Sequence, residues 1–208
     1  MIPGFYNPCM TYSRDEDRGD EDGRWLTLGR EYLYESPWCS FRVDGVRLPD
    51  GARIEYGVLE SAGFAAVVPV MESGSVALVR QWRQPIEAFT LELPGGGVEG
   101  GEDPREAVRR ELLEETGYRA EDISHLATLH TSPGRATEVC HLFQCRAERT
   151  ISGPQPESTE FISVVEVPLD EAVGRALSGE ISAATTVLGL LMVSGLAAGG
   201  AGGDCGCA

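Results

Sequence analysis

The apolar and polar residues after residue 40 follow a pattern that predicts a series of short strands. Alternating segments on either side of the turn Pro49-Asp50-Gly51 predict a hairpin over residues 40–60. Further along, continuous apolar runs bounded by glycine, proline or charged residues are typical of strands buried in a sheet. Such runs occur at residues 64–70 and 75–80, and further strands are expected over residues 89–93, 124–130, 139–146 and 161–167.

One helix has clear signals at both ends. Asp103 is placed to cap it, Pro104 suits the first helical position, and Glu106 completes a capping box. Gly117 is placed to end it, because glycine readily adopts the left-handed conformation that terminates helices. The sequence therefore predicts a helix over residues 104–116.

Two further helices are expected near the C-terminus, over residues 170–177 and 181–196. Residues 181–203 carry no charge, but many small residues and a short apolar centre favour a buried helix over a membrane span. No membrane association is expected. Strands and helices interleave without a repeated βαβ phase. The predicted fold is α/β, an α/β/α sandwich around a mixed sheet, preceded by a small antiparallel hairpin or sheet.

The chain divides into four predicted parts. Residues 1–39 are polar and aperiodic, so we expect a partly flexible N-terminal arm. The hairpin over residues 40–60 follows, then a main domain over residues 61–198, and a glycine-rich tail over residues 199–208. With 208 residues, of which 42% are hydrophobic, the chain is long enough to bury one sizeable core.

Charge and cysteine usage narrow the function. The chain has 33 acidic and 17 basic residues, a formal net charge of -16. Such a protein repels the phosphates of nucleic acids, so no nucleic-acid binding is expected. An anionic substrate would need a divalent metal to supply local positive charge. The six cysteines lack CxxC spacing and the N-terminus lacks a secretory pattern, which favours a reducing, cytoplasmic location.

Glutamates of the predicted helix form the most informative cluster. Glu111, Glu114 and Glu115 occupy positions i, i+3 and i+4, so their carboxylates share one face. Close anions repel unless cations neutralise them, and carboxylate oxygens suit Mg²⁺ or Mn²⁺. Arg110 offsets part of this charge, and the glycine-rich loop before the helix can fold Glu102 back towards the same face. The alternative is an acidic helix face that is simply exposed to solvent. The spacing of the whole surrounding motif argues against that alternative.

The spacing around these glutamates resembles the Nudix box, G-x5-E-x7-R-E-U-x-E-E-x-G-U, where U is a bulky apolar residue. The last position is usually aliphatic, so the tyrosine found there is the one loose fit. On this motif the chain is identified as a member of the Nudix hydrolases, which implies metal-dependent cleavage of a phosphoanhydride. The matching residues are Gly96, Glu102, Arg110, Glu111, Leu112, Glu114, Glu115, Gly117 and Tyr118.

Segments outside the box resemble the ADP-ribose pyrophosphatase branch of this family. Pro133 falls fifteen residues after Tyr118, where this branch carries a marker proline. The resemblance implies cleavage of ADP-ribose or a related ADP-sugar to AMP and a sugar phosphate. A GDP-mannose or other NDP-sugar pyrophosphatase, or a sensing module without turnover, remain alternatives. The similar segments are residues 47–51, 78–85, 91–95 and 132–134.

The resemblance also implies roles for single residues. Metal binding, to Mg²⁺ or alternatively Mn²⁺, is expected from the carbonyl of Gly95 and from Glu102, Glu111, Glu114 and Glu115. Arg110 is expected to orient these glutamates by ion pairing. The glutamate that activates the attacking water is expected in a later loop, as Glu160 or Glu157, with Glu138 as a third candidate.

Substrate contacts and assembly complete these expectations. Arg83 is expected to bind the diphosphate or adenosine portion, because its planar fork suits such groups. Arg80, Glu92 and Pro133 are further candidates, and a salt bridge at a strand end is the alternative for both arginines. Relatives typically form homodimers through their N-terminal strands, which would be residues 40–60 here. Relatives often have Leu-Pro-Ala-Gly where this chain has Leu-Pro-Gly-Gly-Gly, so a softer loop is expected.

Overall fold

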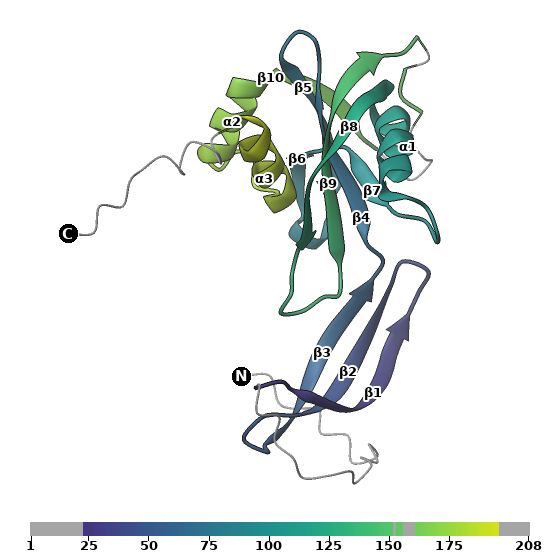
Figure 1. Ribbon diagram of the computed structural model, residues 1–208, viewed down its shortest axis with the longest axis vertical. Helices are drawn as coiled ribbons and strands as arrows, with labels where there is room; N and C mark the ends of the chain where they lie inside the picture. The colour runs from purple at the N-terminus through teal and green to yellow at the C-terminus, as the bar shows by residue number, and fades with distance from the viewer. Residues whose placement is uncertain (1–22, 152, 156–160, 196–208) are drawn as a thin grey trace, which may run out of the picture. The chain divides into compact units, whose positions relative to one another are not determined.

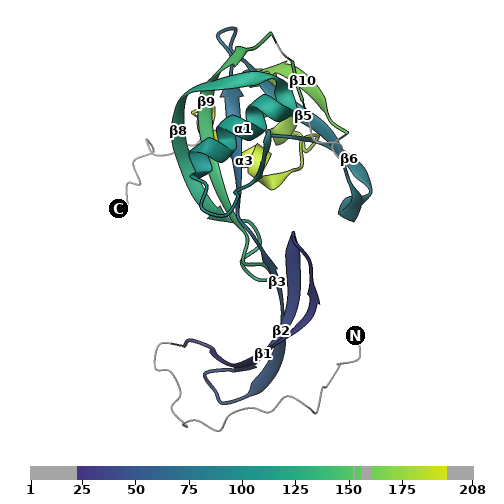
Figure 2. The same ribbon diagram turned by 90° about the vertical axis from the view of Figure 1, so that its right-hand side faces the viewer.

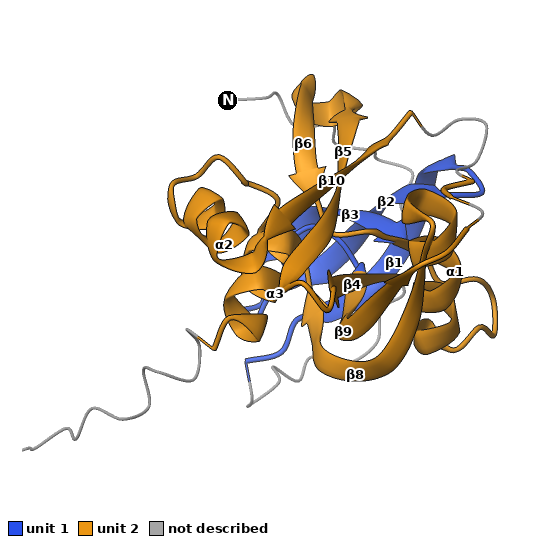
Figure 3. Cartoon of the chain, turned by 90° about the horizontal axis from the view of Figure 1, so that it is seen from above, with its two compact units in different colours: residues 1–62, 132–138 blue, residues 63–131, 139–208 orange. Residues whose placement is uncertain are grey.

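The structure is a computed structural model, which describes residues 23–151, 153–155 and 161–195 of the 208-residue chain. The chain forms two compact units, each with its own sheet (Figure 3). Unit 1 comprises residues 1–62 and 132–138, and unit 2 comprises residues 63–131 and 139–208.

Unit 1 is built on a three-stranded antiparallel sheet (Figure 1). The prediction of a partly flexible arm over residues 1–39 is wrong for Leu26–Glu35, which forms a strand of this sheet. Residues 1–22 lie outside the described residues. The side chains of this strand are exposed or half-buried, so it lacks the one-sided apolar pattern by which strands are predicted. In spatial order the strands are β1 (Leu26–Glu35), β2 (Cys39–Arg47) and β3 (Arg53–Ser61).

A second part of the chain, residues 132–138, belongs to unit 1 because its backbone binds β3. The Leu59 N–H donates to the Arg135 carbonyl at 2.8 Å, and the Thr137 N–H donates to the Leu59 carbonyl at 3.0 Å. These bonds fix the turn that carries Pro133 to the N-terminal sheet.

Unit 2 contains a seven-stranded mixed sheet, as expected, with the order β10-β5-β4-β9-β8. Strand β6 pairs with β5, and the short β7 pairs with β4. The β4 and β9 strands run parallel, whereas the other pairs are antiparallel. The strands are β4 (Phe64–Val70), β5 (Ser75–Arg83), β6 (Ala88–Glu92), β7 (Gly95–Gly97), β8 (Tyr118–His130), β9 (Val139–Arg149) and β10 (Ser163–Pro168), with a 3₁₀ turn η1 (Gln84–Ile86) after β5.

Three helices cover this sheet, α1 (Pro104–Thr116) on one face and α2 (Leu169–Leu177) and α3 (Ala184–Val193) on the other (Figures 1 and 2). Successive side chains of β4 point to opposite faces of the sheet, so they pack against the helices on both faces. Ala65 and Val67 join the cluster around α1, whereas Ala66 and Val68 join the cluster around α2 and α3. The α/β/α sandwich predicted from the sequence is therefore confirmed.

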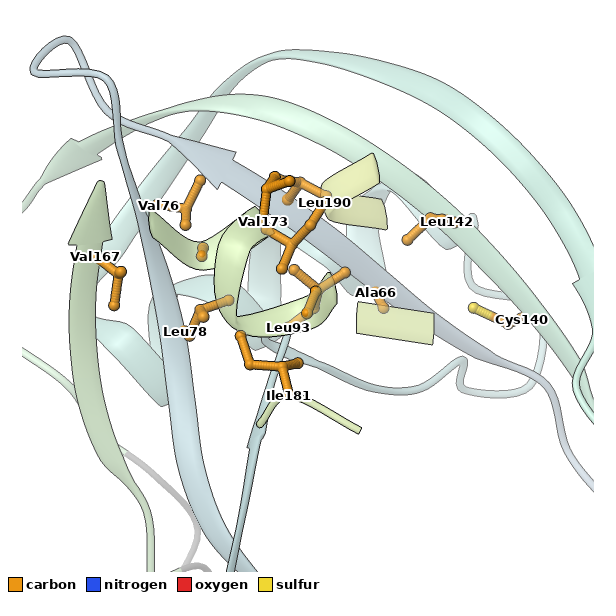
Figure 4. Packing of buried hydrophobic residues seen from close by; sticks show 13 residues of the cluster. Ala66, Val76, Leu78, Leu93, Cys140, Leu142, Val167, Val173, Ile181 and Leu190 are labelled. Carbon is orange, nitrogen blue, oxygen red and sulfur yellow. The ribbon is translucent and has the colours of Figure 1, made fainter. Parts of the chain in front are cut away.

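The cluster around α2 and α3 is the larger core (Figure 4). Leu78, Leu142 and Leu190 are fully buried in it and come from β5, β9 and α3. Burying each such side chain stabilises the fold by roughly 1.5–3 kcal/mol. This core joins α2 and α3 to the face of the sheet opposite α1.

The last helix is shorter than the predicted span of residues 181–196. Small residues in α3 let it pack closely, since a Cβ on Gly189 would lie 2.8 Å from a methyl carbon of Leu93. The Thr186 hydroxyl accepts a hydrogen bond from the Leu93 N–H at 2.9 Å. Within the described part of the chain, no helix is both long and apolar enough to cross a membrane.

Candidate active site on helix α1

Helix α1 begins and ends where its sequence predicts. Asp103 accepts a hydrogen bond from the Arg105 N–H at 2.8 Å, and Pro104 occupies the first turn. Gly117 ends the helix with a left-handed φ of 73°, which most other residues adopt only with strain. These local signals fix the register of the helix, and therefore the direction in which its glutamates point.

Glu115 is held against the backbone of β7. Its Oε2 atom accepts a hydrogen bond from the Gly95 N–H at 2.8 Å, and the residue is only 3% exposed. A Cβ on Gly95 would lie 2.2 Å from the Ala65 carbonyl oxygen, so only glycine allows this strand to approach β4. The soft loop expected here is thus wrong for Gly95–Gly97, which pair with β4 as a strand.

Glu111 lies in a cradle formed by the next glycine. A Cβ on Gly96 would lie 2.3 Å from the Glu111 Oε1 atom, so the carboxylate occupies the space that any other side chain would fill. Gly97, by contrast, has nothing within 4 Å of an added Cβ. The backbone of β7 therefore positions both buried glutamates.

Arg110 binds the remaining acidic groups together, and the ion pairs predicted for it are present. Its Nη1 atom lies 2.7 Å from Glu111 Oε1 and 3.5 Å from Glu114 Oε2. Its Nε and Nη2 atoms donate to the two Glu102 oxygens at 3.2 and 3.1 Å. Nη2 also donates to the Gly97 carbonyl at 3.0 Å, a contact that the sequence did not suggest. Glu102 is thus brought to the same side as the helix glutamates.

Hydrogen bonding dominates the electrostatics of this network. The bonds to Glu102, and then to Glu111, raise the pKa of Arg110 above its already high ordinary value, although burial opposes them. The hydrogen bond from Arg110, and then one from a backbone N–H, lower the pKa of Glu102. Arg110 and Glu102 therefore remain charged at neutral pH, which is the state that metal binding requires of a carboxylate.

The donor set fits a divalent metal. Glu102, Glu111, Glu114 and Glu115 offer hard carboxylate oxygens, and the missing side chain of Gly96 leaves the space that the Glu111 carboxylate occupies. In the described residues, no group of three or more His, Cys, Asp or Glu side chains is arranged as a formed metal site. The carboxylates instead bind Arg110 and the Gly95 N–H, contacts that a metal would compete with.

A second polar cluster lies on the β5–β6 hairpin. The Arg83 Nε and Nη2 atoms donate to the two carboxylate oxygens of Glu92 at 2.8 and 2.6 Å. Thr90 donates a third hydrogen bond to Glu92. Burial alone would raise the pKa of Glu92, but the hydrogen bonds from Arg83 and Thr90 outweigh it, and the pKa is lowered. The salt bridge weighed as an alternative for Arg83 is therefore present.

Arg80 lies elsewhere on this hairpin. Its guanidinium stacks over the Phe89 ring, 3.8 Å from the centroid. Trp82 meets the same ring edge-on, with centroids 5.3 Å apart. The aromatic face holds the Arg80 guanidinium, whereas Glu92 holds that of Arg83, so the two arginines make different contacts.

The other predicted residues are not brought to α1 by the described contacts. Pro133 and Glu138 lie in unit 1, in the segment fixed to β3. Glu157 and Glu160 lie outside the described residues. The roles assigned to these four residues stay predictions.

Sequence reasoning missed one group of residues beside the site. The Tyr118 hydroxyl donates to Glu166 at 2.7 Å and accepts from Arg149 at 2.9 Å. These residues lie on β8, β10 and β9. The only sequence signal was that Tyr118 departs from the aliphatic residue usual at its position in the box.

Comparison with known proteins agrees with this geometry. Residues 62–186 match the model of the NUDIX domain, and residues 25–59 match that of the nucleoside diphosphate sugar hydrolase N-terminal domain. An ADP-ribose pyrophosphatase from Bacillus subtilis (strain 168) is 32% identical over 161 residues, which cover 77% of this chain and 87% of the relative. A GDP-mannose pyrophosphatase from Yersinia enterocolitica is 32% identical over 124 residues, covering 56% and 64% of the two chains.

Solved structures show the same fold. The crystal structure of an ADP compounds hydrolase superposes with a TM-score of 0.72 at 21% identity, covering 85% of this chain and 96% of that chain. With the box glutamates, the sandwich fold and the matched family model together, the chain belongs to the Nudix hydrolase family. Hydrolases of this family generally depend on a divalent metal.

Proposed function

We propose that this protein hydrolyses the pyrophosphate bond of ADP-ribose or a related ADP-sugar, releasing AMP and a sugar phosphate. The observation that carries the proposal is the placement of Glu111 and Glu115 on the backbone of β7, with Arg110 drawing Glu102 to the same side. The match of residues 25–59 to a nucleoside diphosphate sugar hydrolase domain, and the ADP-ribose pyrophosphatase relative, support the substrate class.

Mg²⁺ is the proposed metal, with Mn²⁺ as the second choice, because all the donors are hard oxygens. Glu111 and Glu115 would hold it, with Glu102, Glu114 and the Gly95 carbonyl in support. When bound, the metal neutralises charge on the pyrophosphate oxygens and lowers the pKa of a water. The protein itself contributes by holding the carboxylates in place, through Gly95, Gly96 and Arg110.

The chain's own residues then have distinct tasks. Arg110 orients its carboxylate partners and does not need to touch the substrate. Arg83 is proposed to bind the diphosphate or adenosine portion, which requires its guanidinium to leave or share Glu92. Glu160 or Glu157 is proposed to take the proton from the attacking water, and Glu138 is the third candidate.

Product analysis tests this proposal. The purified protein would be incubated with ADP-ribose, ADP-glucose and GDP-mannose, each with Mg²⁺ and with EDTA. We expect AMP from ADP-ribose at the highest kcat/KM, and no product with EDTA. Highest turnover of GDP-mannose would contradict the ADP-sugar assignment while leaving the metal-dependent reaction in place.

Two other functions are alternatives to the hydrolysis of an ADP-sugar. The GDP-mannose pyrophosphatase relative favours a different base, and the residues of the box do not specify which base is recognised. A sensing module that binds nucleotide sugars without turnover is the other alternative. The complete set of box glutamates argues against it, and absence of metal-dependent turnover on every nucleotide sugar would favour it.

A homodimer formed through unit 1 is the proposed assembly. Large apolar side chains are exposed on its strands and on the turn between β1 and β2, and exposed apolar patches commonly mark contact surfaces. Light scattering after size exclusion would give twice the chain mass if this is correct, and the mass of one chain if it is not. The exposed side chains include Tyr32, Leu33, Tyr34, Trp38, Phe41 and Leu59.

A cytoplasmic location is proposed, because the cysteines that the structure describes, Cys39, Cys140 and Cys145, are free thiols.

A further inference from the structure

A pocket of about 380 Å³ opens beside Glu115 at the C-terminal end of α1. We call it the Glu115 pocket. Its walls come from the end of α1, the start of β8, the end of β9 and the start of β10. The residues that line it are Glu115, Thr116, Tyr118, Arg149, Pro154, Ile162, Ser163, Val164 and Glu166.

Three of these residues also line a second pocket, of about 660 Å³. Tyr118, Arg149 and Glu166 belong to both, so together they form the wall between the two spaces. The Tyr118 hydroxyl bonds to both partners, Arg149 forms an ion pair with Glu166, and the Arg149 guanidinium lies 5.2 Å from the Tyr118 ring centroid. The wall is thus one bonded group drawn from three strands.

The register of the sheet places this pocket at one end of the site. Glu166 pairs with Ala77 and Val164 pairs with Val79, so the pocket lies beside that part of β5. The Arg83 guanidinium binds Glu92, and Glu92 pairs with Val79 on the opposite edge of β5 from Val164. The guanidinium and the Glu115 pocket therefore lie beside opposite edges of the same part of β5, where they can contact different parts of one nucleotide sugar.

We propose that the Glu115 pocket receives the sugar-phosphate half of the substrate, and that the wall of Tyr118, Arg149 and Glu166 limits the size of the sugar that fits. This inference rests on the proposed function, because the pyrophosphate must lie at Glu115 for the sugar to lie beside it. The pocket offers the acceptors and donors that sugar hydroxyls need, from Glu166, Arg149 and Ser163. The atypical tyrosine of the box is thus a specificity-determining residue.

Changing Tyr118→Leu tests the wall, since leucine is the kind of residue usual at this position and lacks the hydroxyl. NADH and ADP-ribose form a matched pair, because NADH is ADP-ribose that carries a nicotinamide ring on its terminal ribose. We expect the ratio of kcat/KM for NADH to that for ADP-ribose to rise roughly 10-fold in this variant. Tyr118→Phe keeps the ring and should return the ratio most of the way to that of the wild type.

Two further variants complete the design. Arg149→Met changes an exposed side chain of the wall and should raise the same ratio, even if Tyr118→Leu fails to fold. Arg119→Ala is the matched control on β8, since Arg119 lines neither pocket and pairs with Glu121 and Glu148. The ratio should not change in this control.

The outcomes separate this inference from the function on which it rests. Wild-type hydrolysis of ADP-ribose with an unchanged ratio in both wall variants would overturn the size-limiting wall alone. A loss of both activities by the same factor would mean that Tyr118 supports only the fold. Wild-type protein that hydrolyses neither substrate with Mg²⁺ or Mn²⁺ would overturn the proposed function, and the wall with it.

Discussion

The two polar clusters of unit 2 are built in different ways. On α1, Glu111 and Glu115 are 8% and 3% exposed and rest on the backbone of β7. On the β5–β6 hairpin, the Arg83 side chain is 47% exposed and held by another side chain, Glu92. Backbone and core fix the first cluster, whereas the second is held between side chains, by contacts that a ligand can exchange. The proposed chemistry therefore lies in the rigid region, and substrate binding in the adaptable one.

The largest effect is expected from Glu115→Gln. Glutamine has the shape of glutamate and can still accept the hydrogen bond from the Gly95 N–H, but it removes the charge that a divalent metal needs. We expect kcat for ADP-ribose to fall about 10³-fold with little change in thermal stability. Glu106→Gln, in the first turn of the same helix, should keep wild-type kcat. Equal activity in the two variants would contradict the role of Glu115.

The second-largest loss of activity is expected from adding a single methyl group to β7. In Gly96→Ala the new Cβ would lie 2.3 Å from the Glu111 carboxylate, which must move. Displacing a reacting group by about 1 Å can cost roughly 10²-fold, so we expect a loss of that size in kcat/KM. Gly97→Ala is the matched control, because its Cβ meets nothing within 4 Å. If both variants lose activity equally, the cradle does not position Glu111.

A smaller effect, of a different kind, is expected on the hairpin. Arg83→Lys keeps the charge but loses the fork that binds two oxygens at once. We expect KM for ADP-ribose to rise about 10-fold while kcat stays within a few-fold, since the change removes binding and leaves the reacting groups in place. Steady-state kinetics separate the two parameters. A fall in kcat with unchanged KM would mean that Arg83 takes part in the chemical step. It would contradict the division between chemistry on α1 and substrate binding on the β5–β6 hairpin.

The smallest effect concerns stability against pH. The pKa of Glu92 lies below its ordinary value in the folded protein, so its ion pair stabilises the fold above that ordinary value and is lost as pH falls through the lowered pKa. Glu92→Gln should lower the free energy of unfolding at pH 7 by at most about 1 kcal/mol, because Arg83 is half exposed. Denaturant unfolding should show that difference shrinking as the pH falls below the ordinary pKa of a glutamate. A difference that grows on acidification would contradict the lowered pKa.

The sequence predicted the features that depend on local signals. Helix α1 spans residues 104–116 as expected, because its capping residues lie next to it in the chain. The spacing of Glu111, Glu114 and Glu115 also fixed their shared side. Strand β1 was missed because none of its side chains is buried, and β7 because three glycines have no strand preference of their own and pair only through β4.

Contacts between distant residues could not be predicted from the sequence. Tyr118 is 31 residues from Arg149 and 48 from Glu166, so only the folded sheet brings them together. The pairing of Arg83 with Glu92 needed the β5–β6 register, which depends on η1 at the turn. The position of Pro133 in unit 1 likewise follows from hydrogen bonds to β3 that leave no pattern in the sequence.

The most direct test of the central claim is a titration of Mn²⁺ binding, followed by electron paramagnetic resonance, on three matched proteins. The claim is that the glutamates held on β7 and α1 form the metal site of this hydrolase. Wild-type protein and Glu106→Gln should bind Mn²⁺ with the same affinity, and Glu115→Gln should bind at least roughly 10-fold more weakly. The same affinity in all three proteins would contradict the claim, because the metal would then be held elsewhere.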